Sequence, residues 1–572
     1  MQTDSTYKTI PQPLDLCKVE LMVGKDVFEL LNNEEFKTGW DTLYATCSWA
    51  TVFQSREFVT AWYNIYQKEY LPILVRTESN GQLQGLLTLA LKVPGGSDVS
   101  SDLRNKRVRI VGAGHFEAEY QTWLTADGDG FEFINNALSE VLELYPKCDI
   151  LFRYIPAQVP VEWTSTKPQW KSRCIIEPFR RPLMDLRDPD LPKMFRKSEF
   201  RNKLNRLKRL GELQFEEITD LGTFTAILPE LTVQFDFRQG AMFNKNRFKE
   251  NPLKSEFLIA LFQQNLLHVT LLRTEQQILA AIVALAGKDW VHLGGINIHS
   301  PLKANYYSPG FVHFLMLGQR LSEAGYATFD LTPGGDSYKE RLATTHDFVY
   351  ELTVTNNPVY FIKRGLRKSV HHTLIRAGLR PMSVELSVIR TVYVLKARLK
   401  VIKKKGLLRH LLENLASKDK AKKYKVYQLK QGSVAGEVSV RVRKNSFKDL
   451  LDYNQGLSKQ TRWEFLEDAM HRFEVGEQSF TWAEDGVLLA CAWLSDPKTL
   501  IKSNKLEVEL PGNAQVLQIL CSHQNSKAEL ESFIAGVTGM IYSEIKNAEL
   551  YAITTGADKS VDRAIHYLRR EL

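Results

Sequence analysis

A helix start at Ser308-Pro309-Gly310 has the residue types best suited to binding a phosphate group. Proline fits the first turn of a helix, and apolar residues recur at helical spacing over 311–324. The first N–H groups of a helix have no intrahelical acceptor, and the helix dipole adds partial positive charge, so this start can bind a phosphate or pyrophosphate. Asn305 is a further candidate contact. The alternative is an ordinary helix start.

Tyr338 and Lys339 follow a Gly-rich turn, Pro333-Gly334-Gly335, which itself follows a short β-prone segment at 326–331. A tyrosine can give a proton to a leaving group, and a lysine can hold an oxyanion or a phosphate. The alternative is a turn with a packed tyrosine and an exposed lysine.

Glu119 and Tyr120 follow a strand-like stretch and Gly112–Gly114, so we expect them on a loop that can face an acceptor. Glu119 suits a general base, or a group that binds the acceptor hydroxyl, and Tyr120 suits a neighbouring contact. Arg238 can lie in the same cleft. A solvated carboxylate and a structural salt bridge are the alternatives.

Two basic stretches admit two interpretations each. Residues 193–210 predict a basic amphipathic helix that either binds a phosphorylated acceptor or RNA, or packs its apolar stripe and leaves its charges in solvent. Residues 363–405 are helical and basic, and peripheral contact with an anionic membrane is one option. They lack the aromatic apolar face that such helices often use, which favours a solvated surface.

The elements that would position these residues occur twice in the same order: helix, hairpin, strand, loop, helix, strand. We therefore expect an α/β (α+β) protein with mixed sheets. A polar lead-in at 1–20 precedes two similar units at 20–190 and 190–357. A basic helical linker at 358–424 leads to a third, degenerate unit at 425–572, whose final helix is expected at 560–572.

Composition excludes several classes of protein. The chain has 572 residues with 44% hydrophobic and 25% charged, typical of globular domains, and its net charge is +9. Its apolar runs are too short to span a membrane, and its N-terminus has no apolar signal core. The six cysteines are scattered and form no zinc-like cluster with histidine, so no metal is expected. We expect a reduced, cytoplasmic protein.

Four stretches resemble the CelD-type acetyltransferases of the GNAT superfamily: FQSREFVTAW (53–62), Arg201-Asn202-Lys203-Leu204, Ser308-Pro309-Gly310 and FDLTPGGDSYKERL (329–342). The chain is also similar to Fem-type peptidyltransferases, which carry two GNAT units in tandem. Asp330, Gly335, Tyr338 and Lys339 match the most specific element of the family. The resemblance covers roughly residues 50–350.

The resemblance implies acyl transfer from acetyl-CoA or another acyl-CoA to an amine or hydroxyl, without a metal. It places Gly335 with the cofactor-binding residues and Asp330 with the substrate-binding ones. The implied acceptor is a small molecule or glycan precursor, in exopolysaccharide or cell-envelope biosynthesis. However, the usual glycine-rich pyrophosphate loop is absent: Ala304–Gly310 stands in its place, and SHQNSK (522–527) in the third unit.

Two other functions stay open. A Fem-type enzyme would use aminoacyl-tRNA, which the basic helix favours, and only in that case is nucleic acid an expected partner. A scaffold or regulator of polysaccharide synthesis would keep the fold without catalysis, which the missing glycines favour. Fold class does not choose among these.

Overall fold

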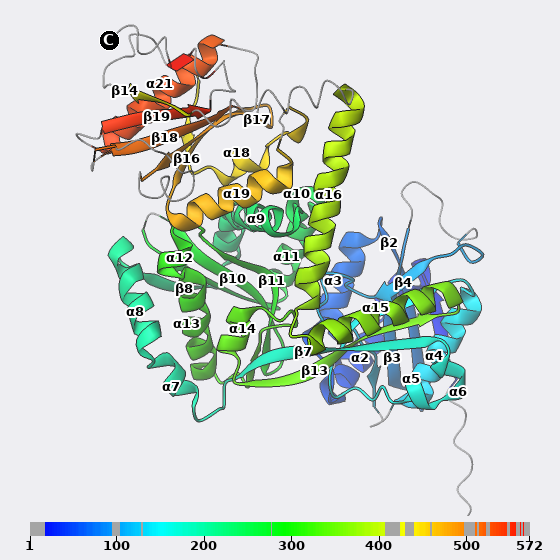
Figure 1. Cartoon of the computed structure of the whole chain (residues 1–572). Coiled ribbons are helices and arrows are strands. Elements are labelled where there is room, and N and C mark those ends of the chain that lie inside the picture. Colours follow the sequence, from blue (N-terminus) through cyan, green and yellow to red (C-terminus); the bar gives the residue numbers. More distant parts are fainter. Residues whose placement is uncertain are drawn as a thin grey trace, which may run out of the picture.

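Two mixed sheets organise the chain (Figure 1). The computed structural model describes residues 18–93, 103–126, 130–275, 277–405, 424–429, 440–457, 460–496, 510–511, 514–521, 527–545, 549–555, 561 and 564–565. One sheet has 13 strands and the other six. The expected α/β class with mixed sheets is confirmed. Residues 406–423 of the expected linker at 358–424, and nearly all of the expected helix at 560–572, lie outside the described residues.

The first unit forms one end of the large sheet. Ser79-Asn80-Gly81-Gln82 makes the hairpin turn expected between two apolar strands, with both Asn80 and Gly81 at positive φ. The elements of this unit are β1 (Glu20–Val23), α1 (Lys25–Leu30), α2 (Glu34–Thr46), α3 (Arg56–Tyr66), β2 (Tyr70–Ser79), β3 (Gln82–Lys92), β4 (Arg109–Gly112), β5 (Leu124–Thr125), α4 (Phe131–Leu144), β6 (Asp149–Ile155), α5 (Trp163–Thr166), α6 (Pro168–Lys171) and β7 (Cys174–Asp185).

The second unit forms the other end. The basic helix expected at 193–210 is not continuous, because the chain leaves helical geometry at Lys197 and divides it into α7 and α8. The elements are α7 (Leu191–Phe195), α8 (Ser198–Leu207), β8 (Gln214–Ile218), α9 (Leu221–Phe243), α10 (Arg247–Glu250), α11 (Leu253–Gln263), β9 (Leu267–Arg273), β10 (Ile278–Ala286), β11 (Trp290–His299), α12 (Ala304–Tyr307), α13 (Pro309–Glu323), β12 (Thr328–Asp330), α14 (Ser337–Leu342) and β13 (Thr345–Thr355).

The two units share their central strands. The sheet order is β1-β2-β3-β4-β6-β13-β7-β12-β11-β10-β9-β8, so β13, the last strand of the second unit, lies between β6 and β7 of the first. β7 in turn pairs with β12 of the second unit. The units therefore form one continuous sheet, and their expected limits at 190 and 357 remain a proposal.

Helices α15 (Pro358–Arg376) and α16 (Pro381–Lys405) follow and lead to the C-terminal unit. That unit has a six-stranded sheet in the order β14-β19-β18-β17-β16-β15. In Figure 1 it lies above α9 of the second unit. Its elements are β14 (Tyr424–Leu429), β15 (Arg443–Lys444), α18 (Phe447–Leu451), α19 (Arg462–Val475), β16 (Gln478–Glu484), β17 (Val487–Ser495), β18 (Ala514–Cys521), α21 (Lys527–Glu544) and β19 (Glu549–Thr555).

Each unit contains one parallel strand pair joined by a helix: β4-α4-β6, β11-α13-β12 and β18-α21-β19. In the second unit, apolar side chains cover both faces of the sheet. Val312, Phe314 and Leu317 of α13 pack on one face, whereas α9 and α11 pack on the other. Helix α11 also meets α3 of the first unit, with the rings of Phe58 and Phe257 5.3 Å apart. Helices thus cover both faces of this part of the large sheet, and α11 also connects it to the first unit.

Candidate functional site

The strands β11 and β12 pair for only three residues and then part. Trp290 to His292 pair with Thr328 to Asp330, where β12 ends, while β11 continues to His299. A bulge at Gly294-Gly295 follows His292, because three residues of β11 there oppose Ala284 alone. Gly295 has φ of 23°, and a Cβ on it would lie 2.7 Å from the Val283 carbonyl oxygen. The bulge thus needs glycine, and it marks an opening between the two strands.

The start of α13 lies beside this opening. The helix begins at Pro309, close to the expected position, and Ser308 precedes it in a left-handed conformation (φ 52°) without capping it through its side chain. The N–H groups of Gly310 and Phe311 belong to the first turn and have no intrahelical acceptor. A Cβ on Gly310 would lie 3.0 Å from Nδ1 of His299. Glycine here therefore lets the last residue of β11 approach the helix start.

Positive charge surrounds this helix start. The Arg206 guanidinium of α8 lies 4.9 Å from the ring centre of Tyr306, and its Nη1 donates to the Tyr306 carbonyl at 3.4 Å. The Lys203 ammonium lies 4.4 Å from the ring centre of Phe311. Asn305 is exposed on the same turn, in α12. The basic helix thus lies against the expected anion site, which the sequence did not indicate.

Tyr338 and Arg238, expected from separate stretches, meet at Asn297 of β11. The Asn297 side-chain amide donates to the Tyr338 hydroxyl at 3.4 Å, and Arg238 donates to the Asn297 carbonyl at 2.9 Å. Burial raises the pKa of Tyr338 to about 12, so its hydroxyl is protonated at neutral pH. Burial and the charge of Arg238 lower the pKa of His299 to about 3, so this ring is neutral. The cluster combines a protonated hydroxyl with one cation at the opening.

Lys339 points away from that cluster and holds the Gly-rich turn. Its ammonium donates to the carbonyl and hydroxyl oxygens of Thr332, at 3.2 and 2.9 Å, and the residue is 6% exposed. Burial lowers its pKa. Gly335 is exposed and lies next to Arg380, which immediately precedes α16. In this geometry Lys339 fixes the turn that carries Tyr338.

A buried charged network occupies the opposite face of the sheet, where the strands part. Nδ1 of His292 lies 2.8 Å from Oδ2 of Asp330, and Arg181 lies 3.6 Å from the same oxygen. Arg181 also donates to Asp347, with 2.7 Å from Nε to Oδ1. Burial alone would raise the pKa of Asp330, but Arg181 and His292 lower it to about 2. Tyr120 is fully buried, and the Arg181 guanidinium lies 5.0 Å from its ring centre.

The charge on Asp330 fixes the tautomer of His292. An ionised carboxylate only accepts hydrogen bonds, so Nδ1 of a neutral ring must carry the proton and Nε2 the lone pair. His292 and Arg181 line a cavity of about 250 Å³ between the two units, with Trp49, Trp290 and Ser48 among its other walls. A histidine oriented by a buried carboxylate at a cavity wall has the arrangement of a general base.

Glu119 lies near this network but is committed elsewhere. Its carboxylate pairs with Arg153 at 3.0 Å, and its side chain is 15% exposed. The structure thus places Tyr338, Ser308 and Gly310 on the α13 face, where Arg238 reaches the Asn297 carbonyl from α9, and it places Tyr120 with Asp330 on the other face. Sequence reasoning missed His292, Arg181 and His299 as site residues. Only the position of Asp330 could have indicated His292, since Asp330 ends the strand that pairs with it.

No metal site accompanies these residues in the part of the chain that the structure describes: no group of three or more His, Cys, Asp or Glu side chains could hold an ion. Among the same residues, no helix combines the length and hydropathy that crossing a bilayer requires.

Comparison with known proteins places a family domain over this site. Residues 194–340 match the acetyltransferase (GNAT) domain, which covers α8, β11, α13 and the Gly-rich turn. No curated protein matches the chain.

Three solved structures with some similarity to the chain are distant. FemX is 12% identical and covers 57% of this chain and 98% of its own, with a TM-score of 0.39. A tandem GNAT protein from the clavulanic acid biosynthesis pathway is 12% identical, with 60% and 99% covered and a TM-score of 0.35. L-PGS from Bacillus licheniformis is 14% identical, with 50% and 87% covered and a TM-score of 0.33. Similarities at this level carry no functional inference.

Proposed function

We propose that this chain transfers an acyl group from acyl-CoA to an amine or hydroxyl of a small-molecule or glycan-precursor acceptor. The observation that carries the proposal is the opening between β11 and β12, within the matched acetyltransferase domain. It has a helix start with free N–H groups and basic side chains on one face, and a histidine–aspartate pair on the other. CoA would bind as substrate on the α13 face, with its phosphates at Gly310 and Phe311.

The proton path follows from the two faces. His292 Nε2 takes the proton of the acceptor N–H or O–H as that atom attacks the thioester carbonyl, and Asp330 stabilises the ring that becomes charged. The tetrahedral intermediate then collapses: the bond to sulfur breaks and CoA leaves as a thiolate. Tyr338 is protonated and can return a proton to that sulfur. We assign the base to His292 rather than to Glu119, since Arg153 already holds the Glu119 carboxylate.

The cavity beside His292 suits an acceptor group that carries no net charge. Its two cations already have partners. Arg181 forms ion pairs with Asp347 and Asp330. The Lys288 ammonium donates hydrogen bonds to the carbonyls of Tyr44 and Ala45, at 2.9 and 2.7 Å. Aromatic, aliphatic, amide and hydroxyl side chains supply most of the rest of the wall, and Asp289 adds one negative charge beside Lys288. Its volume is slightly below the range of about 300–1,000 Å³ common for ligand pockets, so it fits one small group.

Calorimetric titration with acetyl-CoA and CoA tests the donor site. Gly310→Trp should abolish CoA binding, because its side chain would fill the space between the helix start and His299. Gly539→Trp is the control, since this exposed helical glycine in α21 has no neighbour within 4 Å of its Cβ position. Failure of the unmodified chain to bind either compound would exclude acyl-CoA as donor.

A tRNA-dependent transferase is the second candidate, favoured by exposed basic residues such as Arg201 of α8 and Lys208 just after it. Binding of charged tRNA that is lost when Arg201 and Arg206 are reversed in charge, together with no CoA binding, would support it. Binding of neither compound would favour a non-catalytic scaffold.

A further inference from the structure

Helices α15 and α16 carry more positive charge than the whole protein. Residues 358–405 contain thirteen Lys and Arg but only one acidic residue, Glu385, a net charge of +12 against +9 for the whole chain. The remaining residues are thus slightly acidic. Such a concentration on two adjacent helices indicates an anionic partner.

The outer side of α15 is apolar. Val359, Ile362, Leu366 and Val370 recur at spacings of three and four, which places them on one helical face, and they are 73, 60, 63 and 55% exposed. The other side anchors the helix to the large sheet: Arg364 pairs with Glu351, and His371 lies between Glu177 and Glu385. The stripe is therefore left bare although the helix is firmly attached.

Helix α16 likewise turns its polar side toward the protein and its apolar side outward. Its polar side meets the C-terminal unit, where Arg390 pairs with Glu467 and the Tyr393 hydroxyl donates to Gln455 at 2.8 Å. Val388, Val392, Leu395 and Leu399 lie about 180° away around the helix and are exposed by 42 to 62%. A soluble helix normally buries its apolar face, so this one lacks a partner among the described residues.

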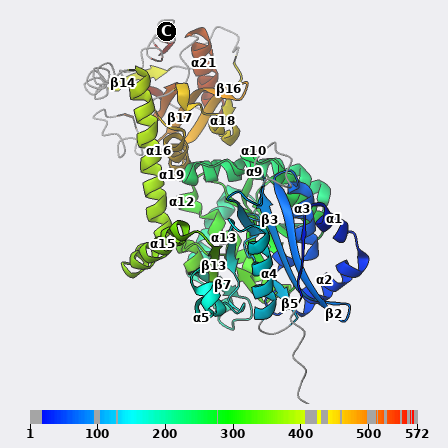
Figure 2. The ribbon, with the colours of Figure 1, turned by 90° about the vertical axis from the view of Figure 1, so that its right-hand side faces the viewer.

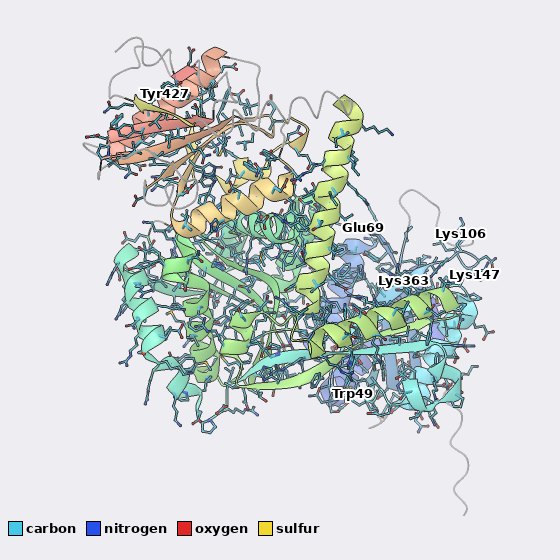
Figure 3. All side chains as sticks on the ribbon, viewed as in Figure 1. Trp49, Glu69, Lys106, Lys147, Lys363 and Tyr427 are labelled. Atoms are coloured by element: carbon cyan, nitrogen blue, oxygen red, sulfur yellow. The ribbon has the colours of Figure 1, made fainter. Side chains whose placement is uncertain are left out.

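The two helices lie on the same side of the molecule. Figure 2 shows both along its left edge, and Lys363, labelled in Figure 3, lies on α15. Twelve of the seventeen exposed large apolar side chains in the described part of the chain lie between Val359 and Leu399. This surface, the α15–α16 face, combines bare aliphatic stripes with dense positive charge.

We propose that the α15–α16 face docks on an anionic phospholipid surface. Aliphatic stripes flanked by Lys and Arg fit a bilayer interface, where the apolar side chains enter the headgroup boundary and the cations meet lipid phosphates. A second copy of this chain would set two positively charged faces against each other and be repelled, even though Arg364, Arg380 and Arg390 already pair with carboxylates of the same chain. A nucleic acid would match the charge but not the aliphatic stripes. Lipid is the partner that satisfies both features.

Docking would also place the candidate site near the bilayer. Arg380, in the short connection between the two helices, pairs with Asp336 at 3.0 Å and lies beside Gly335 of the Gly-rich turn. The proposed donor site does not depend on this placement, and the lipid proposal does not depend on the donor site.

Vesicle sedimentation with the full chain tests the proposal. The protein should sediment with vesicles of phosphatidylcholine and phosphatidylglycerol in equal parts, and about tenfold less with phosphatidylcholine alone or in high salt. Leu366→Gln combined with Leu395→Gln should weaken binding to the anionic vesicles by about tenfold or more, because each leucine contributes apolar burial. Met242→Gln combined with Val475→Gln removes two exposed apolar side chains elsewhere and should change nothing.

Three results would overturn the proposal. One is no sedimentation of the unmodified chain with anionic vesicles. Another is equal binding by the stripe variant, whose melting temperature would confirm that it is folded. The third is a stable dimer in light scattering that the stripe variant makes monomeric, since the face would then join two copies of the chain.

Discussion

At the scale of single residues, the candidate site depends on which donors and charged side chains already have a hydrogen-bond or ion-pair partner. Lys339 and Glu119 both have the types expected of catalytic groups, yet Thr332 and Arg153 engage them. His292 had no favourable spacing in the sequence, but a buried carboxylate orients it at a cavity wall. Residue types in the sequence thus predict a region, whereas the partner of each side chain indicates which residue is available to act.

His292→Gln tests this assignment. Glutamine keeps a polar side chain but cannot accept a proton as a base, so acyl transfer should fall by about 10²–10⁴-fold. With no acceptor identified, the measurement is the hydrolysis of acetyl-CoA by water, monitored through the free thiol that it releases. The CoA dissociation constant should stay unchanged, because His292 lies on the face opposite the donor site. Equal rates of hydrolysis in the unmodified chain and in the His292→Gln variant would contradict the assignment.

At the scale of elements, the sequence predicted most strands and helices but not β7 and β13, which lie at the centre of the large sheet. Pro178 and Pro182 argue against a strand at 174–185, since proline cannot donate to a ladder. Both are tolerated because β7 pairs fully with β13 but meets β12 only at 183–185. The other edge of β7 near these prolines therefore needs no donor. The sharing of strands between units depends on such long-range pairing, which local patterns do not show.

Helix α8 offers a prediction at the same scale. Arg206 contacts the turn before α13, whereas Arg201 on the same helix is exposed and makes none of the contacts described for that turn. Arg206→Glu should weaken CoA binding by about tenfold, with a smaller salt dependence, because it places a negative charge beside the phosphate site. Arg201→Glu should leave CoA binding nearly unchanged in calorimetric titration. Equal losses of CoA affinity in both variants would contradict a local phosphate site. They would indicate an effect spread over the basic surface, which is the kind of surface that binds tRNA.

At the scale of the whole molecule, the C-terminal unit contacts the second unit both at α9 and beside the start of α13. Phe237 and Ala241 of α9 belong to one apolar cluster with Leu466, Phe473 and Trp493 of the C-terminal unit. The Lys303 N–H, in the loop before α12, donates to the Phe473 carbonyl at 2.8 Å. A further cavity of about 150 Å³ lies between Pro309 and Gly476–Gln478. The sequence indicated a third unit but not this contact, because the cluster joins residues more than 200 positions apart.

This attachment predicts that a ligand of the second unit stabilises the C-terminal unit as well. A compound that binds only the folded state raises the unfolding temperature of every part that unfolds together with its site. In scanning calorimetry, CoA should therefore raise the unfolding temperature of the C-terminal unit in the unmodified chain. Trp463 is 3% exposed, and its ring nitrogen donates to the Ala241 carbonyl at 3.1 Å. Trp463→Ala should remove about 3–5 kcal/mol from this contact, so that the C-terminal unit unfolds separately and no longer responds to CoA. A C-terminal transition that ignores CoA already in the unmodified chain would mean that the shared cluster does not couple the two units.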